Sequence, residues 1–179
     1  MPEIETSRLR LRMFTPEDLD ALASILSDRD VVRYLGMGEP RSREKSQATI
    51  DAILSHWNKH GFGIWALDHK ERGQLIGWCG LQFLDKTPEV EVAYLLDKPY
   101  WGAGLATEGA LASLQYGFDQ LKLDRIVAIA RPENVASYRV MDKVGMKYER
   151  DAHYYNIDVV YYAITREAYE LKAAQALSK

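Results

Sequence analysis

The start of the chain alternates between apolar and charged side chains. Leu9, Leu11 and Met13 are separated by arginines, and this period of two predicts a half-buried strand. Thr15 and Pro16 then match the N-cap and the first position of a helix. Apolar residues at helical spacing predict that this helix continues through Leu19, Leu22, Ala23 and Leu26.

The rest of the chain divides into segments of helical and strand periodicity. A second amphipathic helix is predicted from Arg43 to His60, with Gly61 at its end. Turn residues then separate three predicted strands, Phe62 to Leu67, Leu75 to Phe83 and Val90 to Leu96. The remaining predicted elements are a helix from Ala103 to Gln120, a buried strand from Arg125 to Ala130, a helix from Asn134 to Val144, strands from Met146 to Tyr154 and from Ile157 to Ile164, and a helix from Arg166 to Leu177.

This order of elements predicts one α+β domain over residues 1–179. Strands come first in antiparallel sequence and crossover helices come later, which indicates a mixed, mostly antiparallel sheet of seven strands. Helices on both faces of that sheet give a three-layer α/β arrangement. The chain has 179 residues and 47% hydrophobic composition, enough for one sizeable core, and no repeat or linker divides it.

Charge and composition exclude several classes of protein. A formal net charge of -3 gives no basic footprint for nucleic acid, and the apolar stretches are too short to span a membrane. The first residues lack the apolar core of a signal peptide, and Cys79 is the single cysteine, so we expect a protein of the reducing cytoplasm. The four histidines match no metal-ligand pattern, and no metal site is expected.

The first candidate site is a glycine-containing turn that follows the predicted strand from Val90 to Leu96. There, Gly102-Ala103-Gly104-Leu105-Ala106-Thr107 leads into a predicted helix. Backbone N–H groups at such a helix start bind anions, above all phosphate, and glycines let the phosphate approach closely. A purely structural turn is the alternative. The segment is not a P-loop, because Leu105 follows Gly104, and Thr107 stands where a dinucleotide fingerprint has its third glycine.

A second candidate site follows the buried strand from Arg125 to Ala130. Asn134 and Ser137 lie one turn apart at the start of the next predicted helix. Taken alone, this pair is typical of an N-cap followed by a surface serine. The two candidate sites together carry more information than either does alone.

Tyr100-Trp101-Gly102-Ala103-Gly104-Leu105-Ala106-Thr107-Glu108 and Pro132-Glu133-Asn134-Val135-Ala136-Ser137 closely resemble the GNAT superfamily of acetyl-coenzyme A-dependent N-acetyltransferases. Within it, the chain is similar to the RimJ/RimL-like branch, which includes ribosomal-protein N-terminal acetyltransferases. The resemblance runs from Thr6-Ser7-Arg8-Leu9 to the paired strands before Arg166. It implies a sheet whose central strands splay apart. It also implies transfer of an acetyl group from acetyl-coenzyme A to a primary amine, either a protein N-terminus or a small molecule.

Two positions depart from the wider superfamily. Pro99 stands where Gln or Arg is usual, although the aromatic pair Tyr100-Trp101 is usual for the branch. Met141 stands where the wider superfamily often has a tyrosine as general acid, and methionine cannot donate a proton. The branch instead resembles this chain in carrying a serine three residues after the asparagine, here Ser137.

The resemblance implies where acetyl-coenzyme A, as co-substrate, would bind. The pantetheine arm would pair with the backbone of Leu95 and Leu96 like an added strand, with an N–H near Leu95 as oxyanion donor. Asn134 would hydrogen-bond the arm from the far side, and Ser137 would serve the leaving sulfur. The pyrophosphate would bind the amides of Gly102, Ala103, Gly104, Leu105, Ala106 and Thr107.

We expect the amine to attack the thioester directly. Cys79, the single thiol, lies in an apolar strand away from both motifs and is typical of a small buried hydrophobe. Glu91 is the candidate general base, because a carboxylate buried in so apolar a strand would have a raised pKa. Exposure of Glu91 on the open face of an antiparallel sheet is the alternative interpretation.

Two other classes of function stay open at this point. The chain could bind acyl-coenzyme A as a sensor without transferring the acyl group, or serve as a non-catalytic interaction domain of the same fold. The sequence specifies neither the acceptor nor the choice between monomer and homodimer. Several aromatic residues could line an acceptor site, but aromatics at such spacing mostly form core and none is assigned: Tyr34, Trp57, Trp65, Trp78, Tyr154 and Tyr155.

Overall fold

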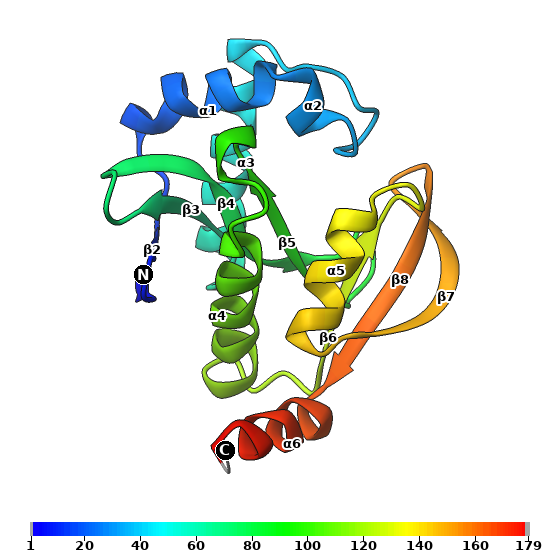
Figure 1. Ribbon diagram of the computed structural model, residues 1–179. Helices are drawn as coiled ribbons and strands as arrows, with labels where there is room; N and C mark the ends of the chain where they lie inside the picture. Colours follow the sequence, from blue (N-terminus) through cyan, green and yellow to red (C-terminus); the bar gives the residue numbers. More distant parts are fainter. Residues whose placement is uncertain (1, 178–179) are drawn as a thin grey trace.

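An eight-stranded sheet organises the computed structural model, which describes residues 2–177 (Figure 1). Its strands are, in chain order, β1 (Ile4–Glu5), β2 (Leu9–Arg12), β3 (Ile64–His69), β4 (Gln74–Phe83), β5 (Val90–Leu96), β6 (Arg125–Ala130), β7 (Lys147–Tyr154) and β8 (Ile157–Thr165). Their spatial order is β1-β2-β3-β4-β5-β6-β8-β7. Only β5 and β6 are parallel neighbours, so the predicted mixed, mostly antiparallel sheet is confirmed. The strand beyond the predicted seven is the two-residue edge strand β1.

Helices cover both faces of this sheet. They are η1 (Pro16–Asp18), α1 (Leu19–Ser27), α2 (Arg29–Val32), α3 (Arg43–His60), η2 (Lys98–Tyr100), α4 (Leu105–Asp119), α5 (Val135–Val144) and α6 (Arg166–Leu177). In Figure 1, α4 and α5 lie side by side in front of the sheet, with α1 and α2 above it and α3 behind. None of the helices within residues 2–177 combines the length and apolar character needed to cross a membrane.

The ends of the two helices beside the site follow the local sequence. The Ser42 hydroxyl accepts a hydrogen bond from the amide of Lys45 at the start of α3, and Gly61 ends that helix with a φ of 75°. Asn134 caps α5, and Gly145 ends it with a φ of 98°. Glycine tolerates these left-handed angles because it has no Cβ.

The core forms two layers because side chains of β5 alternate between the two faces. Val92 and Leu96 pack into the cluster under α4 and α5. Ala93 and Leu95 pack into the second cluster, under α1 and α3. This alternation is the period of two predicted for the strand.

The sheet opens between its two parallel central strands. β5 pairs with β4 along its whole length, from Val90 to Leu96. Against β6 it has a single residue pair in register, Glu91 with Val127. Beyond that pair the strands diverge towards their carboxyl ends, so the splay that the family resemblance implied is present. On the side that faces β6, the divergence leaves the backbone of the second half of β5 without a strand partner.

The hairpin of β7 and β8 reaches across to the turn between β4 and β5. Tyr155 and Asn156 form its tip, with φ values of 50° and 60°. The amide of Tyr155 donates to Asp85 Oδ2 at 3.1 Å, and the amide of Asp85 donates to the Tyr155 hydroxyl at 2.7 Å. This pair of hydrogen bonds fixes the hairpin tip over β5.

Candidate active site

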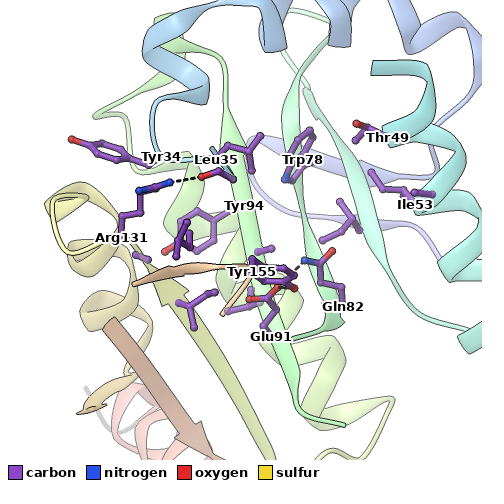
Figure 2. Close-up of a pocket in the computed structure, with 18 of the residues that line it drawn as sticks. Tyr34, Leu35, Thr49, Ile53, Trp78, Gln82, Glu91, Tyr94, Arg131 and Tyr155 are labelled. Carbon is purple, nitrogen blue, oxygen red and sulfur yellow. Dashed lines mark hydrogen bonds between the residues drawn. The ribbon is translucent and has the colours of Figure 1, made fainter. Parts of the chain in front are cut away.

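A cavity of about 790 Å³ lies where β5 and β6 diverge. Its walls come from the loop after α2, one face of α3, β4, β5, β6, the start of α5 and the hairpin tip (Figure 2). This volume is in the range of about 300–1,000 Å³ typical of small-molecule sites. The cavity wall includes two residues predicted from the sequence, Glu91 and Asn134, together with Tyr94.

Glu91 is buried in this wall, with 4% of its surface exposed. Its Oε1 accepts hydrogen bonds from Gln82 Nε2 at 2.7 Å and from the Tyr155 hydroxyl at 2.9 Å. Burial raises the pKa of Glu91 to about 7, and the hydrogen bonds from Gln82 and Tyr155 oppose that rise. The alternative interpretation, an exposed sheet face, is wrong. A carboxyl group with this pKa can accept a proton near neutral pH.

Ser137 is buried rather than at the surface, and it contacts Tyr94. Its Oγ lies 2.9 Å from the Tyr94 hydroxyl, which also donates to the Ser137 carbonyl oxygen at 3.1 Å. Burial raises the pKa of Tyr94 above its usual range, so the phenol stays protonated. Two hydroxyl groups from β5 and α5 therefore meet across the opening between the central strands.

Asn134 is both the N-cap of α5 and a residue of the cavity wall. Its Oδ1 accepts a hydrogen bond from the amide of Ser137 at 3.3 Å and so caps α5. The side chain also lines the cavity. Its amide nitrogen donates to no other described residue, so capping and ligand binding are compatible.

The backbone of β5 presents alternate residues to its two neighbouring strands. The amide of Asp97 donates to the Ile76 carbonyl at 2.8 Å, across the antiparallel pair with β4. The Leu95 carbonyl faces β4 as well, since a Cβ on Gly77 would lie 2.0 Å from its oxygen. Because hydrogen-bonding direction alternates along a strand, Leu96 directs its amide towards β6 and the opening, whereas Leu95 directs its own towards β4.

The glycine turn offers free amides at the start of α4. Gly102 and Gly104 have φ values of 74° and 79°, and a Cβ on Gly102 would meet nothing within 4 Å. No side chain caps the helix, and the amides of Leu105, Ala106 and Thr107 have no acceptor among the described residues. Unsatisfied amides at the positive end of a helix dipole fit a phosphate group.

Residues near the N-terminus hold this turn in place. Glu108 in the first turn of α4 accepts hydrogen bonds from the Thr6 hydroxyl at 2.6 Å and from the amide of Arg8 at 2.9 Å. The Arg8 guanidinium bonds Glu108 at 2.7 Å and the Ala103 carbonyl at 2.8 Å. The segment Thr6-Ser7-Arg8, where the family resemblance begins, is thus joined to the glycine turn in space.

Cys79 lies outside the site. It is fully buried in the core layer under α4, where its thiol contacts the Ser113 hydroxyl at 3.4 Å. Burial raises the pKa of Cys79 to about 12, so it holds no reactive thiolate at neutral pH. Among residues 2–177, no group of three or more His, Cys, Asp or Glu side chains could hold a metal ion.

Several cavity residues were not predicted from the sequence. Gln82 is directly opposite Glu91 in the register of β4 and β5, which only the pairing reveals. Tyr155 is one of the aromatic residues to which the sequence assigns no role. His56 on α3 lines the cavity, and burial lowers its pKa. For Tyr94 the sequence did indicate a position: the predicted alternation of β5 places it on the same face of the strand as Val92.

Residues 8–147 match the family model described as an acetyltransferase (GNAT) domain. The chain therefore belongs to the GNAT family of acetyltransferases, which take the acetyl group from acetyl-coenzyme A. YkkB of Bacillus subtilis is 30% identical over 165 residues, covering 89% of this chain and 94% of YkkB. YnaD of the same organism, named as an N-acetyltransferase, is 33% identical over 146 residues, covering 82% and 83%.

Solved structures agree with this assignment. An acetyltransferase of the GNAT family from Bacillus anthracis superposes with a TM-score of 0.80 at 30% identity, covering 93% of this chain and 99% of that one. A RimL ribosomal α-N-protein acetyltransferase in complex with coenzyme A has a TM-score of 0.78, with 93% and 99% covered. At 17% identity, the second likeness shows the shared fold alone. Acetyl transfer is the activity of the family, and these relatives support it for this chain.

Proposed function

We propose that this enzyme acetylates a primary amine by direct attack, with Glu91 as general base and Ser137 beside the leaving sulfur. One observation carries the proposal. A buried carboxyl group with a pKa of about 7 lies in the wall of a cavity at the divergence of β5 and β6. Ser137 lies at the same divergence, in contact with Tyr94 of β5.

The co-substrate would bind along the opening between the central strands. Its phosphates fit the free amides of the glycine turn, residues 102–107, and its pantetheine arm fits between Leu95, Leu96 and Asn134. Within that arrangement we assign the amide that faces the arm and the oxyanion to Leu96 rather than to Leu95, because alternation turns the Leu95 amide towards β4. The thioester supplies an activated acetyl group when it is bound there.

The side chains divide the proton transfers between them. Glu91 accepts a proton from the ammonium form of the acceptor, while Gln82 and Tyr155 hold its Oε1 and leave Oε2 without a partner among the described residues. Ser137 donates its hydroxyl hydrogen to the departing sulfur when the single O–H of Tyr94, on β5, is directed to Ser137 Oγ and so orients that hydroxyl. Both roles match the transition state more closely than the ground state.

The acceptor class follows from the RimJ/RimL-like branch, a protein N-terminus or a small amine. YdaF of Bacillus subtilis, which is named as a ribosomal N-acetyltransferase, is 25% identical over 174 residues and supports the branch. A free and fully buried Cys79 supports a location in the reducing cytoplasm. We place no nucleic acid or membrane among its partners and allow a monomer or a homodimer.

The test is a screen of N-terminal peptides, amino acids, polyamines and other small amines with acetyl-coenzyme A, in which the release of free coenzyme A thiol is measured. We expect at least one acceptor class to give amine-dependent thiol release together with an acetylated product of the expected mass. Tight binding of acetyl-coenzyme A with no thiol release from any acceptor would instead favour the non-catalytic sensor.

A further inference from the structure

Two arginines at the cavity differ from every other arginine that is shielded from solvent. Among the described residues, five arginines are half-buried rather than exposed: Arg12, Arg41, Arg125, Arg131 and Arg166. The three away from the cavity have carboxylate partners: Arg12 binds Asp18 and Asp68, Arg125 binds Glu149, and Arg166 lies near Asp124. Arg41 and Arg131 line the cavity, and neither has a carboxylate partner among the residues that the structure describes.

The contacts of these two guanidinium groups leave most of their donors unused. Arg41 donates from Nη1 to the Thr49 hydroxyl at 2.8 Å. Arg131 donates from Nη2 to the Gly36 carbonyl at 2.5 Å, and its buried Nε has no acceptor within residues 2–177. A guanidinium group has five N–H donors, so each could bind an additional acceptor.

Charge is distributed unevenly around the cavity. Positive charge comes from three residues that line the cavity: Arg41 in the loop after α2, the exposed Lys45 at the start of α3, and Arg131 at the end of β6. Glu91 is the one carboxyl group among the described residues that line it. In Figure 2, Arg131 lies at the left and Thr49, the partner of Arg41, lies at the upper right, with Glu91, Gln82 and Tyr155 below and between them.

Burial without an anionic partner is unfavourable for a guanidinium group. Burial lowers the pKa of Arg41, the direction expected when the charged form lacks compensation. An anion in the cavity would provide that compensation. The planar fork of arginine matches a carboxylate with two parallel hydrogen bonds, which lysine cannot provide.

We propose that the acceptor is an amine that also carries a carboxylate, and that Arg41 binds this carboxylate while Glu91 takes the proton from the amine. Lys45 and Arg131, which also line the cavity, add to its positive potential. The inference rests on the proposed function and specifies its substrate class. The carboxylate could belong to a free amino acid or to an acidic side chain next to a protein N-terminus, and both present the same group to Arg41.

Matched acceptors distinguish these sources and test the inference. One pair compares a free amino acid with its amide, and the other compares peptides with Asp or Asn as their second residue. Thiol release gives kcat/KM for each acceptor with wild type, Arg41→Gln and Arg41→Lys. Arg43→Gln is the control, because Arg43 is two residues away and exposed, pairs with Asp20 and does not line the cavity.

For each enzyme we take the ratio of kcat/KM for the carboxylate acceptor to kcat/KM for its amide. The ratio of the variant is then divided by the ratio of wild type. This double ratio cancels the intrinsic reactivity of each amine. We expect Arg41→Gln to lower the ratio by about 10–100-fold, the range for a hydrogen bond between charged groups. The KM for acetyl-coenzyme A should stay unchanged, Arg41→Lys should restore part of the preference, and Arg43→Gln should match wild type. The acceptor pair whose ratio falls in Arg41→Gln shows whether the carboxylate belongs to a free amino acid or to an acidic side chain next to a protein N-terminus.

Two outcomes would overturn the inference while leaving the proposed function intact. In the first, the wild-type enzyme releases thiol, and Arg41→Gln has the same ratio of kcat/KM for the carboxylate acceptor to kcat/KM for its amide as wild type. The other is an Arg41→Gln variant whose sole change is a higher KM for acetyl-coenzyme A, which would assign the guanidinium to the co-substrate. Absence of thiol release from wild type with every acceptor would contradict the proposed function itself.

Discussion

The Tyr155 hydroxyl donates a hydrogen bond of 2.9 Å to Glu91 Oε1, although 64 positions separate the two residues in the chain. The same hydroxyl accepts a hydrogen bond from the amide of Asp85 at 2.7 Å. The hairpin tip is therefore attached both to the carboxyl group and to the turn beside it. A residue of the last hairpin thus influences the protonation of a residue in the middle of the sheet.

We expect Tyr155→Phe to move the acidic limb of the pH–rate profile to higher pH. The phenol stabilises the carboxylate and holds the pKa of Glu91 down, so its loss raises that pKa and delays formation of the base. One hydrogen bond corresponds to a shift of about 0.5–1 pH unit. The measurement is kcat/KM against pH. Tyr154→Phe is the control, since the Tyr154 hydroxyl contacts Arg150 instead. An unmoved limb would remove Tyr155 from this role.

Glu91→Gln keeps the shape of the side chain and removes the proton acceptor. We expect turnover to fall by about 100–10,000-fold below the pKa of the acceptor amine, where the substrate arrives as ammonium. At higher pH the free amine needs no base, so activity should partly recover. The measurement is kcat and KM across this range. A loss that is constant with pH and lies wholly in KM would make Glu91 a cation-binding residue.

The same substitution should change how stability depends on pH. The pKa of Glu91 is raised from 4.5 to about 7 on folding, so the folded state retains the proton where the unfolded chain has lost it. This stabilisation is fully present below about pH 4.5 and is lost as pH rises through about 7. The Tm of Glu91→Gln should therefore rise relative to the Tm of wild type as the pH increases from 5 to 8. Parallel curves would show that Glu91 does not titrate in this interval.

Ser137→Ala tests assistance to the leaving sulfur. We expect turnover to fall by about 10–1000-fold with little change in acetyl-coenzyme A affinity, because the hydroxyl acts mainly in the transition state. Tyr94→Phe should cost less, since it leaves the Ser137 hydroxyl in place. Ser113→Ala is the control, a buried serine that bonds Gly109 away from the cavity. A larger loss in Tyr94→Phe than in Ser137→Ala would assign the proton donation to Tyr94.

Gly104→Val tests the phosphate site. Acetyl-coenzyme A at about 100 times its Kd should raise the Tm of wild type by about 5–10 °C. The variant should lose most of this shift, because a branched side chain obstructs the amides at the start of α4. Gly73→Val is the control: Gly73 has a φ of 61° and open space around it, so backbone strain is matched far from the phosphate site. Equal ligand-induced shifts in both variants would disprove the phosphate role.

Local sequence by itself determined most of the elements, β1 and α2 apart, and the two motif segments. Helix ends at Ser42, Gly61, Asn134 and Gly145 depend on side chains and backbone angles within a few residues, and periodicity depends on which face is buried. These features are local, so the sequence specified them. The period of two also placed Glu91 on the face opposite Val90 and Val92.

Tertiary structure decided what each candidate group can do. Whether the Glu91 face is buried depends on the hairpin that closes over it, and the Tyr155 contact depends on strand order in the sheet. The direction of the Leu95 and Leu96 amides follows from pairing with β4. Arg41 and Arg131 meet at one cavity without carboxylate partners because loops 90 residues apart converge there. Burial, register and missing partners are properties of distant segments in contact, and a one-dimensional pattern does not contain them.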